Sequence, residues 1–398
     1  MGDTVRQHPA EEMSSATPMQ GDDGPRPGGE REGIVRQTNE LRRTPTIRDV
    51  AALAGVSIGT VSKSLNGREG VSARTRAKVL EASEQLGFHS NALARNLLTG
   101  RSFTVGLITN DSFGRFSIPV MLGAEDSLQA GQIAVLLCDG RDDVIREQHY
   151  VRTLLARRVD GIIVTGRRID PRPPLRTDYP IPTVYAMAES TDPADASILP
   201  DDEGGGRLAV EHLLATGRTR IGHITGPSDF HAVRLRAAGA TRALADAGLS
   251  MAGLGPIHGQ WSEEWGRQAA YILLRQANDV DAIFCGSDQI ARGVAGSLRD
   301  MGCNVPDDIA LVGFDNWTVM AEASRPPLTT VDMNLSQVGR TAAQVLLAAI
   351  GGQTTHGTQF VPCQLVVRES TRTDSPRRSA STAGDRLATQ SSNAPSHQ

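Results

Sequence analysis

The segment Thr46-Ile-Arg-Asp-Val-Ala-Ala-Leu-Ala-Gly-Val-Ser-Ile-Gly-Thr-Val-Ser-Lys-Ser-Leu-Asn66 encodes two short helices joined by a tight turn. Thr46 is a suitable N-cap for the first helix, and Gly55 ends it because glycine accepts the left-handed backbone of such a turn. Ser57 caps a second helix from Ile58 to Leu65, which Asn66 and the glycine after it bring to an end.

A third helix follows, with Ser72 as its N-cap and Gly87 at its end. The order helix, tight turn, helix and supporting helix is that of the helix-turn-helix module. Residues 46–101 contain eight basic and four acidic side chains, a formal charge of +4, whereas the whole chain carries −4. A basic module on an acidic body predicts that one end of the molecule contacts phosphates.

The rest of the chain alternates strand-like and helical runs, which predicts an α/β body of two subdomains with doubly wound parallel sheets. Ligands of such sheets bind beyond the carboxyl ends of the strands. The strand-like runs are Val105–Thr109, Ile133–Cys138, Gly161–Val164, Thr183–Ala186, Ile221–Thr225, Ala282–Cys285, Ile309–Phe314 and Gln364–Val367. The helical runs are Val120–Gln129, Arg146–Arg157, Leu208–Ala215, Arg236–Ala245, Gly266–Gln276, Ala291–Arg299 and Leu335–Ile350.

Composition sets the expected boundaries. We predict a disordered tail over 1–44, a helix-turn-helix module over 45–90, a linker over 91–101, an α/β body over 102–372, and a disordered tail over 373–398. The chain lacks an apolar run of eighteen residues and a secretory signal, so a cytoplasmic protein without a membrane partner is expected. Its four cysteines are scattered, so neither a metal site nor a cofactor is expected.

The α/β body is also found in two other classes of protein, enzymes and transport-type binding proteins. An enzyme is disfavoured because the chain has no P-loop, no GxSxG elbow, no HExxH and no GxGxxG after the first strand. The triplet Gly204-Gly205-Gly206 opens a helix and could bind an anion, but close helix packing is the favoured interpretation. A transport-type binding protein would share the body but would be secreted and lack the DNA-binding module.

The chain resembles the LacI/GalR regulators over roughly Thr46 to Thr371. The resemblance rests on the segment quoted above and on motifs that follow in family order: Val71-Ser-Ala-Arg-Thr-Arg-Ala-Lys-Val, Leu86-Gly-Phe, Asn91-Ala-Leu-Ala-Arg-Asn-Leu97, Arg158-Val-Asp-Gly-Ile-Ile-Val, Gly204-Gly-Gly-Arg-Leu-Ala, Val312-Gly-Phe-Asp-Asn316, Pro327-Leu-Thr-Thr-Val331 and Val366-Val-Arg-Glu-Ser-Thr371. It implies a transcriptional regulator, commonly a repressor, that binds a pseudo-palindromic double-stranded DNA operator as a homodimer, or as a higher oligomer.

The resemblance places the second helix in the major groove, where base edges can be read. It implies that Ile58, Gly59 and Lys63 face bases, although Gly59 has no side chain to bond one. The residues suited to phosphate contact, in part through their role as caps, are Thr46, Ser57, Thr60, Ser62 and Asn66. Val61 and Leu65 are expected in the core.

The segment from Asn91 to Leu98 resembles the hinge helix of the family, which folds when two copies meet in the minor groove. There Leu97 is expected to act as a wedge between base pairs, and Ala94 to allow close approach. The alternative is an ordinary linker leucine. Ser90 departs from the proline usual before Asn91.

The resemblance also places a small-molecule effector between the two subdomains. The implied contact residues are Phe116, Arg236, Trp261, Ser287, Asp288 and Asp315. Further candidates are Asp201 and Asp202, which end a strand-like run near the expected crossover between subdomains, and Trp317, in the loop after Asp315. An acid, an arginine and aromatic faces suit a sugar or sugar derivative, which offers hydroxyl groups and one apolar face. Alternatives stay open: Arg236 on a helix surface, Trp261 in the core or at a dimer contact, and Asp288 as an N-cap.

Overall fold

The structure is a computed structural model that describes residues 45–65, 69–88, 101–128, 133–175 and 180–372. The chain divides into two compact units, Met1–Ser90 and Asn91–Gln398. No helix within the described ranges is long and apolar enough to cross a membrane.

The first unit contains the three helices expected from the sequence: α1 (Ile47–Ala54), α2 (Ile58–Leu65) and α3 (Ala73–Leu86). Val50, Val61 and Val79, one from each helix, are completely buried and form its small core. Gly55 ends α1 at a φ of +66°, in the left-handed region that glycine adopts without strain. The tight turn between α1 and α2 is therefore encoded locally, as predicted.

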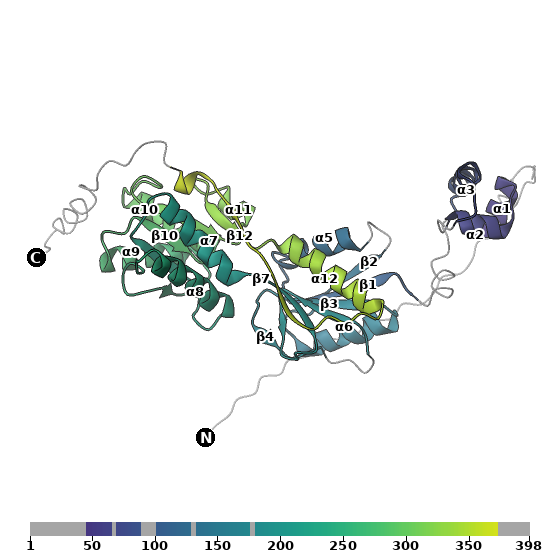
Figure 1. The fold of residues 1–398 in the computed structure, drawn as a ribbon, viewed down its shortest axis with the longest axis horizontal. Helices are drawn as coiled ribbons and strands as arrows, with labels where there is room; N and C mark the ends of the chain where they lie inside the picture. The colour runs from purple at the N-terminus through teal and green to yellow at the C-terminus, as the bar shows by residue number, and fades with distance from the viewer. Residues whose placement is uncertain (1–44, 66–68, 89–100, 129–132, 176–179, 373–398) are drawn as a thin grey trace, which may run out of the picture. The chain divides into compact units, whose positions relative to one another are not determined.

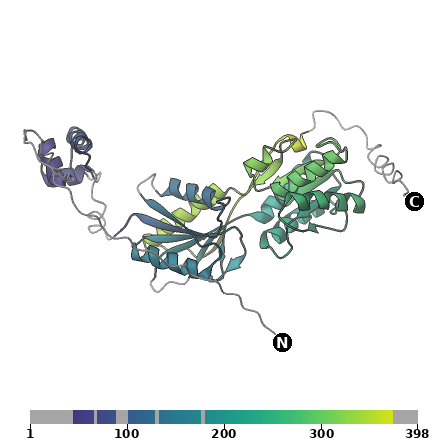
Figure 2. The same ribbon diagram turned by 180° about the vertical axis from the view of Figure 1, so that it is seen from behind.

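The first subdomain of the second unit is built on a six-stranded, wholly parallel sheet. Its spatial order is β13 (Gly357–Val361), β7 (Ala196–Pro200), β5 (Thr183–Ala186), β3 (Gly161–Thr165), β1 (Thr104–Thr109) and β2 (Ala134–Asp139). Helices α5 (Ser117–Ser127) and α12 (Leu335–Ile350) cover one face, and α6 (Val144–Ala156) covers the other (Figure 1). Figure 2 shows the same three layers from behind.

The second subdomain repeats this plan with β14 (Gln364–Val366), β12 (Thr329–Asp332), β11 (Ala310–Phe314), β10 (Ala282–Cys285), β8 (Ile221–Thr225) and β9 (Ile257–His258). Only β14 runs antiparallel to its neighbour among these described strands. Helices α7 (Asp202–Ala215) and α8 (His231–Asp246) pack on one face, and α9 (Glu263–Gln276) and α10 (Asp288–Asp300) on the other. Smaller elements are β4 (Pro171–Arg172), β6 (Glu189–Ser190), α11 (Thr318–Ala321) and a 3-10 turn, Glu369–Thr371.

The chain passes between the two subdomains three times, after β7, after β12 and after β13. Two of these passages, after β7 and after β13, are tied together: the N–H of Asp201 donates to the carbonyl of Val361 at 2.9 Å, and the Cys363 thiol donates to the carbonyl of Asp201 at 3.2 Å. Because of the passage after β12, the first sheet gains α12 on one face and β13 as an edge strand, although both come from the end of the chain (Figure 1).

The predicted fold class is confirmed, but two groups of element predictions were wrong in detail. The predicted runs did not include β12 and β13, whose threonine- and glutamine-containing sequences lack a strong apolar signal. They also did not include β7 or the two-residue strands β4, β6 and β9. Several helices begin earlier than predicted; α7 begins at Asp202 rather than Leu208, since the glycine triplet in its first turns obscures the helical pattern.

That triplet serves close packing, as favoured from the sequence. A Cβ added at Gly206 would lie 2.2 Å from the carbonyl oxygen of Arg236 in α8, and one added at Gly239 would lie 1.9 Å from that of Glu203 in α7. The two helices therefore approach closely enough to bring the N-terminal turn of α7 against Arg236. Reciprocal glycine contacts of the same kind join α5 to α12 through Gly123 and Gly339, and α9 to α10 through Gly266 and Gly293.

Candidate DNA-binding and effector sites

Helix α2 exposes one face and buries the other. Ile58, Gly59 and Lys63 are exposed, with 46% of the Ile58 side chain accessible, while Ser62 is half-buried. Val61 is completely buried and Leu65 packs against the same core, as expected. The residues assigned to base contact therefore share the outward face of the helix, and nothing in the first unit covers Ile58 or Lys63 among the described residues.

The polar residues around α1 and α2 cap helices. The hydroxyl of Ser57 accepts from the N–H of Thr60 at 3.1 Å, and the N–H and hydroxyl of Thr46 both donate to Asp49 at 2.7 Å. The capping role predicted for Ser57 is thus confirmed, while phosphate contact stays a prediction for these residues. Asn66 and the hinge residues Asn91, Ala94 and Leu97 lie outside the described residues.

The second unit brings loops from the carboxyl ends of both sheets together. The N–H of His231 donates to Asp170 across the two subdomains at 3.0 Å, and Arg168 lies 4.2 Å from the ring centroid of Phe230. The Phe230 ring in turn contacts Trp261 edge-on at 5.8 Å. These loops therefore meet at the place between the subdomains where the sequence predicts a ligand. We call this place the cleft, and the loops that each subdomain contributes one of its two walls.

Arg236 belongs to α8 of the second subdomain and is 4% exposed. Its Nε donates to Asp202 at 2.6 Å, and Nη1 donates to the carbonyl of Gly286 at 2.7 Å and lies 3.5 Å from Asp315. The guanidinium also stacks 3.7 Å from the ring centroid of Phe314. The alternative of a surface helix residue is therefore wrong for Arg236: it is buried on the inner face of α8.

Asp315 follows β11 with a φ of +99°, which is unusual for a residue with a side chain. Its N–H donates to the carbonyl of Val331 at 2.8 Å, and the N–H of Asn316 donates to the hydroxyl of Thr330 at 3.3 Å. These bonds hold the turn and aim the carboxylate at the opposite wall, where it forms an ion pair with Arg115 from the first subdomain. A fixed, largely buried carboxylate of this kind can accept hydrogen bonds from ligand hydroxyl groups.

Asp288 is placed differently from the prediction. Its side chain is completely buried, accepting from the N–H of Trp317 at 2.6 Å and from the hydroxyl of Thr330 at 2.5 Å. Burial, reinforced by the negative charge of Asp315, raises the pKa of Asp288 to about 8. Asp288 therefore holds the loop that carries Asp315 and Trp317, and both of its oxygens are occupied without a ligand.

Two further predicted effector residues act as helix caps. The hydroxyl of Ser287 accepts from the N–H of Ile290 at 3.2 Å at the start of α10, so Ser287, and not Asp288, is the N-cap. Asp201 accepts from the N–H of Gly204 at 2.8 Å at the start of α7 and lies in a passage between subdomains, near the crossover expected for it. Ser287 is buried, which leaves little of its surface for a ligand.

Phe116 and Trp317 lie on opposite walls, and the guanidinium of Arg115 contacts both, 4.8 Å and 4.3 Å from their ring centroids. Trp261 packs against Phe230 and against Gly226, where an added Cβ would come within 2.3 Å of the indole. Arg115 therefore joins Phe116 to Asp315 and Trp317, and Asp315 in turn lies 3.5 Å from Arg236. It gives Asp201, Ser287 and Asp288 supporting positions.

The sequence interpretation missed Arg115 and left the partner of Arg236 unassigned. Arg115 stands immediately before Phe116 in the loop after the first strand, so its position alone was a signal that this charge borders the cleft.

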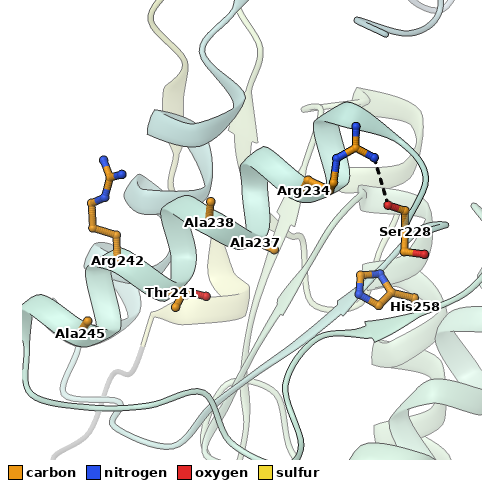
Figure 3. Close-up of a pocket in the computed structure, with 8 residues that line it drawn as sticks. All are labelled: Ser228, Arg234, Ala237, Ala238, Thr241, Arg242, Ala245 and His258. Carbon is orange, nitrogen blue, oxygen red and sulfur yellow. Dashed lines mark hydrogen bonds between the residues drawn. The ribbon is translucent and has the colours of Figure 1, made fainter.

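A separate open groove of about 760 Å³ lies on the outward face of α8. Ala237, Ala238, Thr241 and Ala245 follow one another along the helix there, with Ser228, Arg234 and His258 at one end (Figure 3). Arg234 donates to the carbonyls of Ser228 and Asp229, and Arg242 pairs with Glu203, so both arginines already have partners. None of the predicted effector residues lines this groove.

Two models of known protein families match separate parts of the chain. Residues 46–91 match the model of bacterial regulatory proteins of the lacI family, and residues 210–371 match that of the periplasmic binding protein-like domain.

Two curated relatives cover most of the chain. The HTH-type transcriptional regulator CelR of Thermobifida fusca is 36% identical over 340 residues, which are 83% of this chain and 99% of CelR. The HTH-type transcriptional repressor PurR of Aliivibrio salmonicida (strain LFI1238) is 32% identical over 307 residues, 77% of this chain and 92% of PurR.

Two solved structures are also similar. A complex of the transcriptional regulator CelR with cellobiose has a TM-score of 0.56 and 33% identity, covering 82% of this chain and 99% of that one. The lac repressor dimer bound to operator and the anti-inducer ONPF has a TM-score of 0.63 and 29% identity, covering 83% of this chain and 99% of that one.

Proposed function

Because this chain belongs to the lacI family of bacterial regulatory proteins, we propose that it is a repressor that binds a pseudo-palindromic operator as a homodimer under the control of a sugar. The observation that carries the proposal is that one chain contains both features: an exposed face on α2, and a cleft with a buried Arg236, the fixed carboxylate of Asp315 and two aromatic rings. Its relatives are transcriptional regulators, and we infer that this chain is likewise not an enzyme and acts in the cytoplasm.

At the operator, Lys63 donates to guanine, Ile58 packs on a thymine methyl group, and the capping residues of α1 and α2 contact phosphates. The exposure of Ile58 and Lys63 on one face of α2 supports this assignment. The hinge residues Asn91, Ala94 and Leu97 are assigned to the minor groove from the family resemblance, with Leu97 as the wedge that kinks the duplex.

In the cleft, Asp315 and Arg236 bond sugar hydroxyl groups while Phe116, Trp261 and Trp317 offer apolar faces. The buried pair of Arg236 and Asp202 supports this assignment, because it fixes the guanidinium before any ligand arrives. A ligand that spans both walls changes the angle between the subdomains, and this change is passed to the hinge segments. Coupling between two such sites is typically about 1–3 kcal/mol.

The test uses the purified full-length protein. The protein is mixed with DNA fragments from the genome that encodes it, and the fragments that it retains are identified. Their binding is then measured by gel shift, with and without each sugar of a panel that includes cellobiose. We expect preference for a palindromic sequence and a shift in affinity of about 5- to 150-fold with one sugar. Equal binding to all duplexes would refute the operator assignment; specific binding unmoved by every sugar would refute the sugar assignment.

A further inference from the structure

Arg115 reaches across the cleft from the loop between β1 and α5. Its Nη2 forms an ion pair with Oδ2 of Asp315, and the planar guanidinium contacts the rings of Trp317 and Phe116. The side chain is 19% exposed, and its Nε is buried without a hydrogen-bond partner among the described residues. One side chain of the first subdomain therefore makes a charged contact and a ring contact with the second.

The charge distribution leaves Asp315 dependent on this contact. Arg236, the other cation nearby, is bonded to Asp202 at 2.6 Å and to a backbone carbonyl, and is 3.5 Å from Asp315. Asp202 is thus the main partner of Arg236, and Arg115 is the main partner of Asp315. Hydrogen bonds between ions are stronger than those between neutral groups, and a cation over an aromatic face adds to them.

The guanidinium of Arg115 offers the same features that a bound sugar ring would use. It presents N–H donors at its edge to a carboxylate and a flat face to an indole, where a sugar would present O–H donors and an apolar face. A sugar that bonds Oδ2 of Asp315 and stacks on the side of Trp317 that Arg115 contacts would therefore exclude the guanidinium from this position.

We propose that Arg115 is an internal competitor of the effector, which holds Asp315 and Trp317 in the ligand-free protein and must leave before the effector binds. This inference rests on the proposed function, because it takes Asp315 as an effector residue. It also makes Arg115 a specificity-determining residue: a ligand whose donors do not replace the guanidinium would leave Oδ2 of the largely buried Asp315 carboxylate without a partner. Ligands with two adjacent hydroxyl donors and an apolar face are therefore selected.

The first experiment needs no ligand. Hydrogen exchange of the full-length protein is followed by mass spectrometry in peptides covering 110–118 and 313–318, for the natural chain and for R115M, R115K and R167M. The control, Arg167, forms an exposed ion pair with Asp142 at 2.8 Å within the first subdomain. We expect R115M to exchange at least about tenfold faster in both peptides, R115K to be intermediate because it keeps the charge but loses the planar stack, and R167M to be unchanged.

The second experiment measures sugar binding by calorimetry for the natural chain and R115M, with cellobiose and the sugars that shift operator binding. We expect R115M to bind about tenfold more tightly, because the competitor is gone. Unchanged exchange in R115M, or weaker sugar binding by it, would overturn the proposal; weaker binding would make Arg115 a direct ligand contact. If no sugar binds either protein, the sugar assignment under the proposed function fails, and the exchange result alone decides the role of Arg115.

Discussion

Arg236 in α8 and Asp202 at the start of α7 form an ion pair that is almost completely shielded from water, with 2.6 Å between Nε and Oδ1 and side-chain exposures of 5% and 0%. Breaking such a pair leaves a buried charge, so both groups are held in place. The pair fixes the guanidinium at the base of the cleft and leaves Asp315 as the carboxylate that can exchange partners.

Replacing Asp315 with alanine should abolish the response to the effector while operator binding without effector stays within about threefold. Hydrogen bonds to a charged group contribute about 1.5–3 kcal/mol, so sugar affinity should fall by roughly 10- to 150-fold. Gel shifts with and without sugar measure both quantities. Asp142→Asn, an exposed acid of the same cleft edge, is the control, and a normal response by the Asp315 variant would clear Asp315 of this role.

Asp288 should make stability depend on pH. Its folded pKa, about 8, lies above that of an unfolded aspartate, about 3.9, so the folded state binds more protons between these values. The contribution of this proton binding to the free energy of unfolding is complete below about pH 4. It is lost as the pH rises from there through about 8, at up to about 1.4 kcal/mol per pH unit. Urea unfolding at a series of pH values measures this free energy. The Asp288→Asn variant should lack the decline that the natural chain shows.

Asparagine is a suitable replacement at this position because it can still accept from the N–H of Trp317 and bond the hydroxyl of Thr330. Parallel pH profiles for the two proteins would show that Asp288 is ionised throughout and that its burial does not raise its pKa.

Lys63→Ala should relax sequence preference at the operator. A bidentate contact to one base contributes about 1–3 kcal/mol of discrimination, so preference at one position should fall by roughly 5- to 150-fold. Lys78→Ala, on the exposed side of α3, should leave preference unchanged. Competition gel shifts against single-base operator variants measure the sequence preference. If the Lys63→Ala variant bound all sequences more weakly by the same factor, Lys63 would be assigned to phosphate contact instead.

Gly206→Ala should destabilise the body, because the new Cβ would lie 2.2 Å from the carbonyl oxygen of Arg236. Overpacking of this kind costs about 1–3 kcal/mol, which exceeds the gain of about 1 kcal/mol from better helix propensity. Gly59→Ala is the matched control, since its nearest neighbour is the Ser57 hydroxyl at 3.7 Å.

Thermal unfolding of the two alanine variants separates the effects. The Gly59 variant should stabilise the first unit by up to about 1 kcal/mol in the absence of DNA. A stabilised Gly206 variant would mean that α7 and α8 do not pack as closely as the structure places them.

The amino-acid sequence alone was sufficient to predict the three helices of the first unit and the fold class of the body. The cap at Ser57 and the left-handed stop at Gly55 depend on neighbours within four residues along the chain, and such interactions are encoded locally. The burial of Val61 follows from the apolar face of α2, which the sequence pattern displays. The alternation of strands and helices likewise predicted parallel sheets, because parallel strands need a crossover between them.

Tertiary folding alone settled which cleft groups meet. Asp288 is occupied by Trp317 and Thr330, 29 and 42 residues away, and Arg115 meets Asp315 over a separation of 200 residues. No periodicity links such positions. Asp288 meets Trp317 and Thr330 because β10, β11 and β12 are neighbours in the second sheet. Arg115 meets Asp315 because the loops after β1 and β11, from different sheets, lie together, so the partner of each charge depends on how strands and subdomains pack.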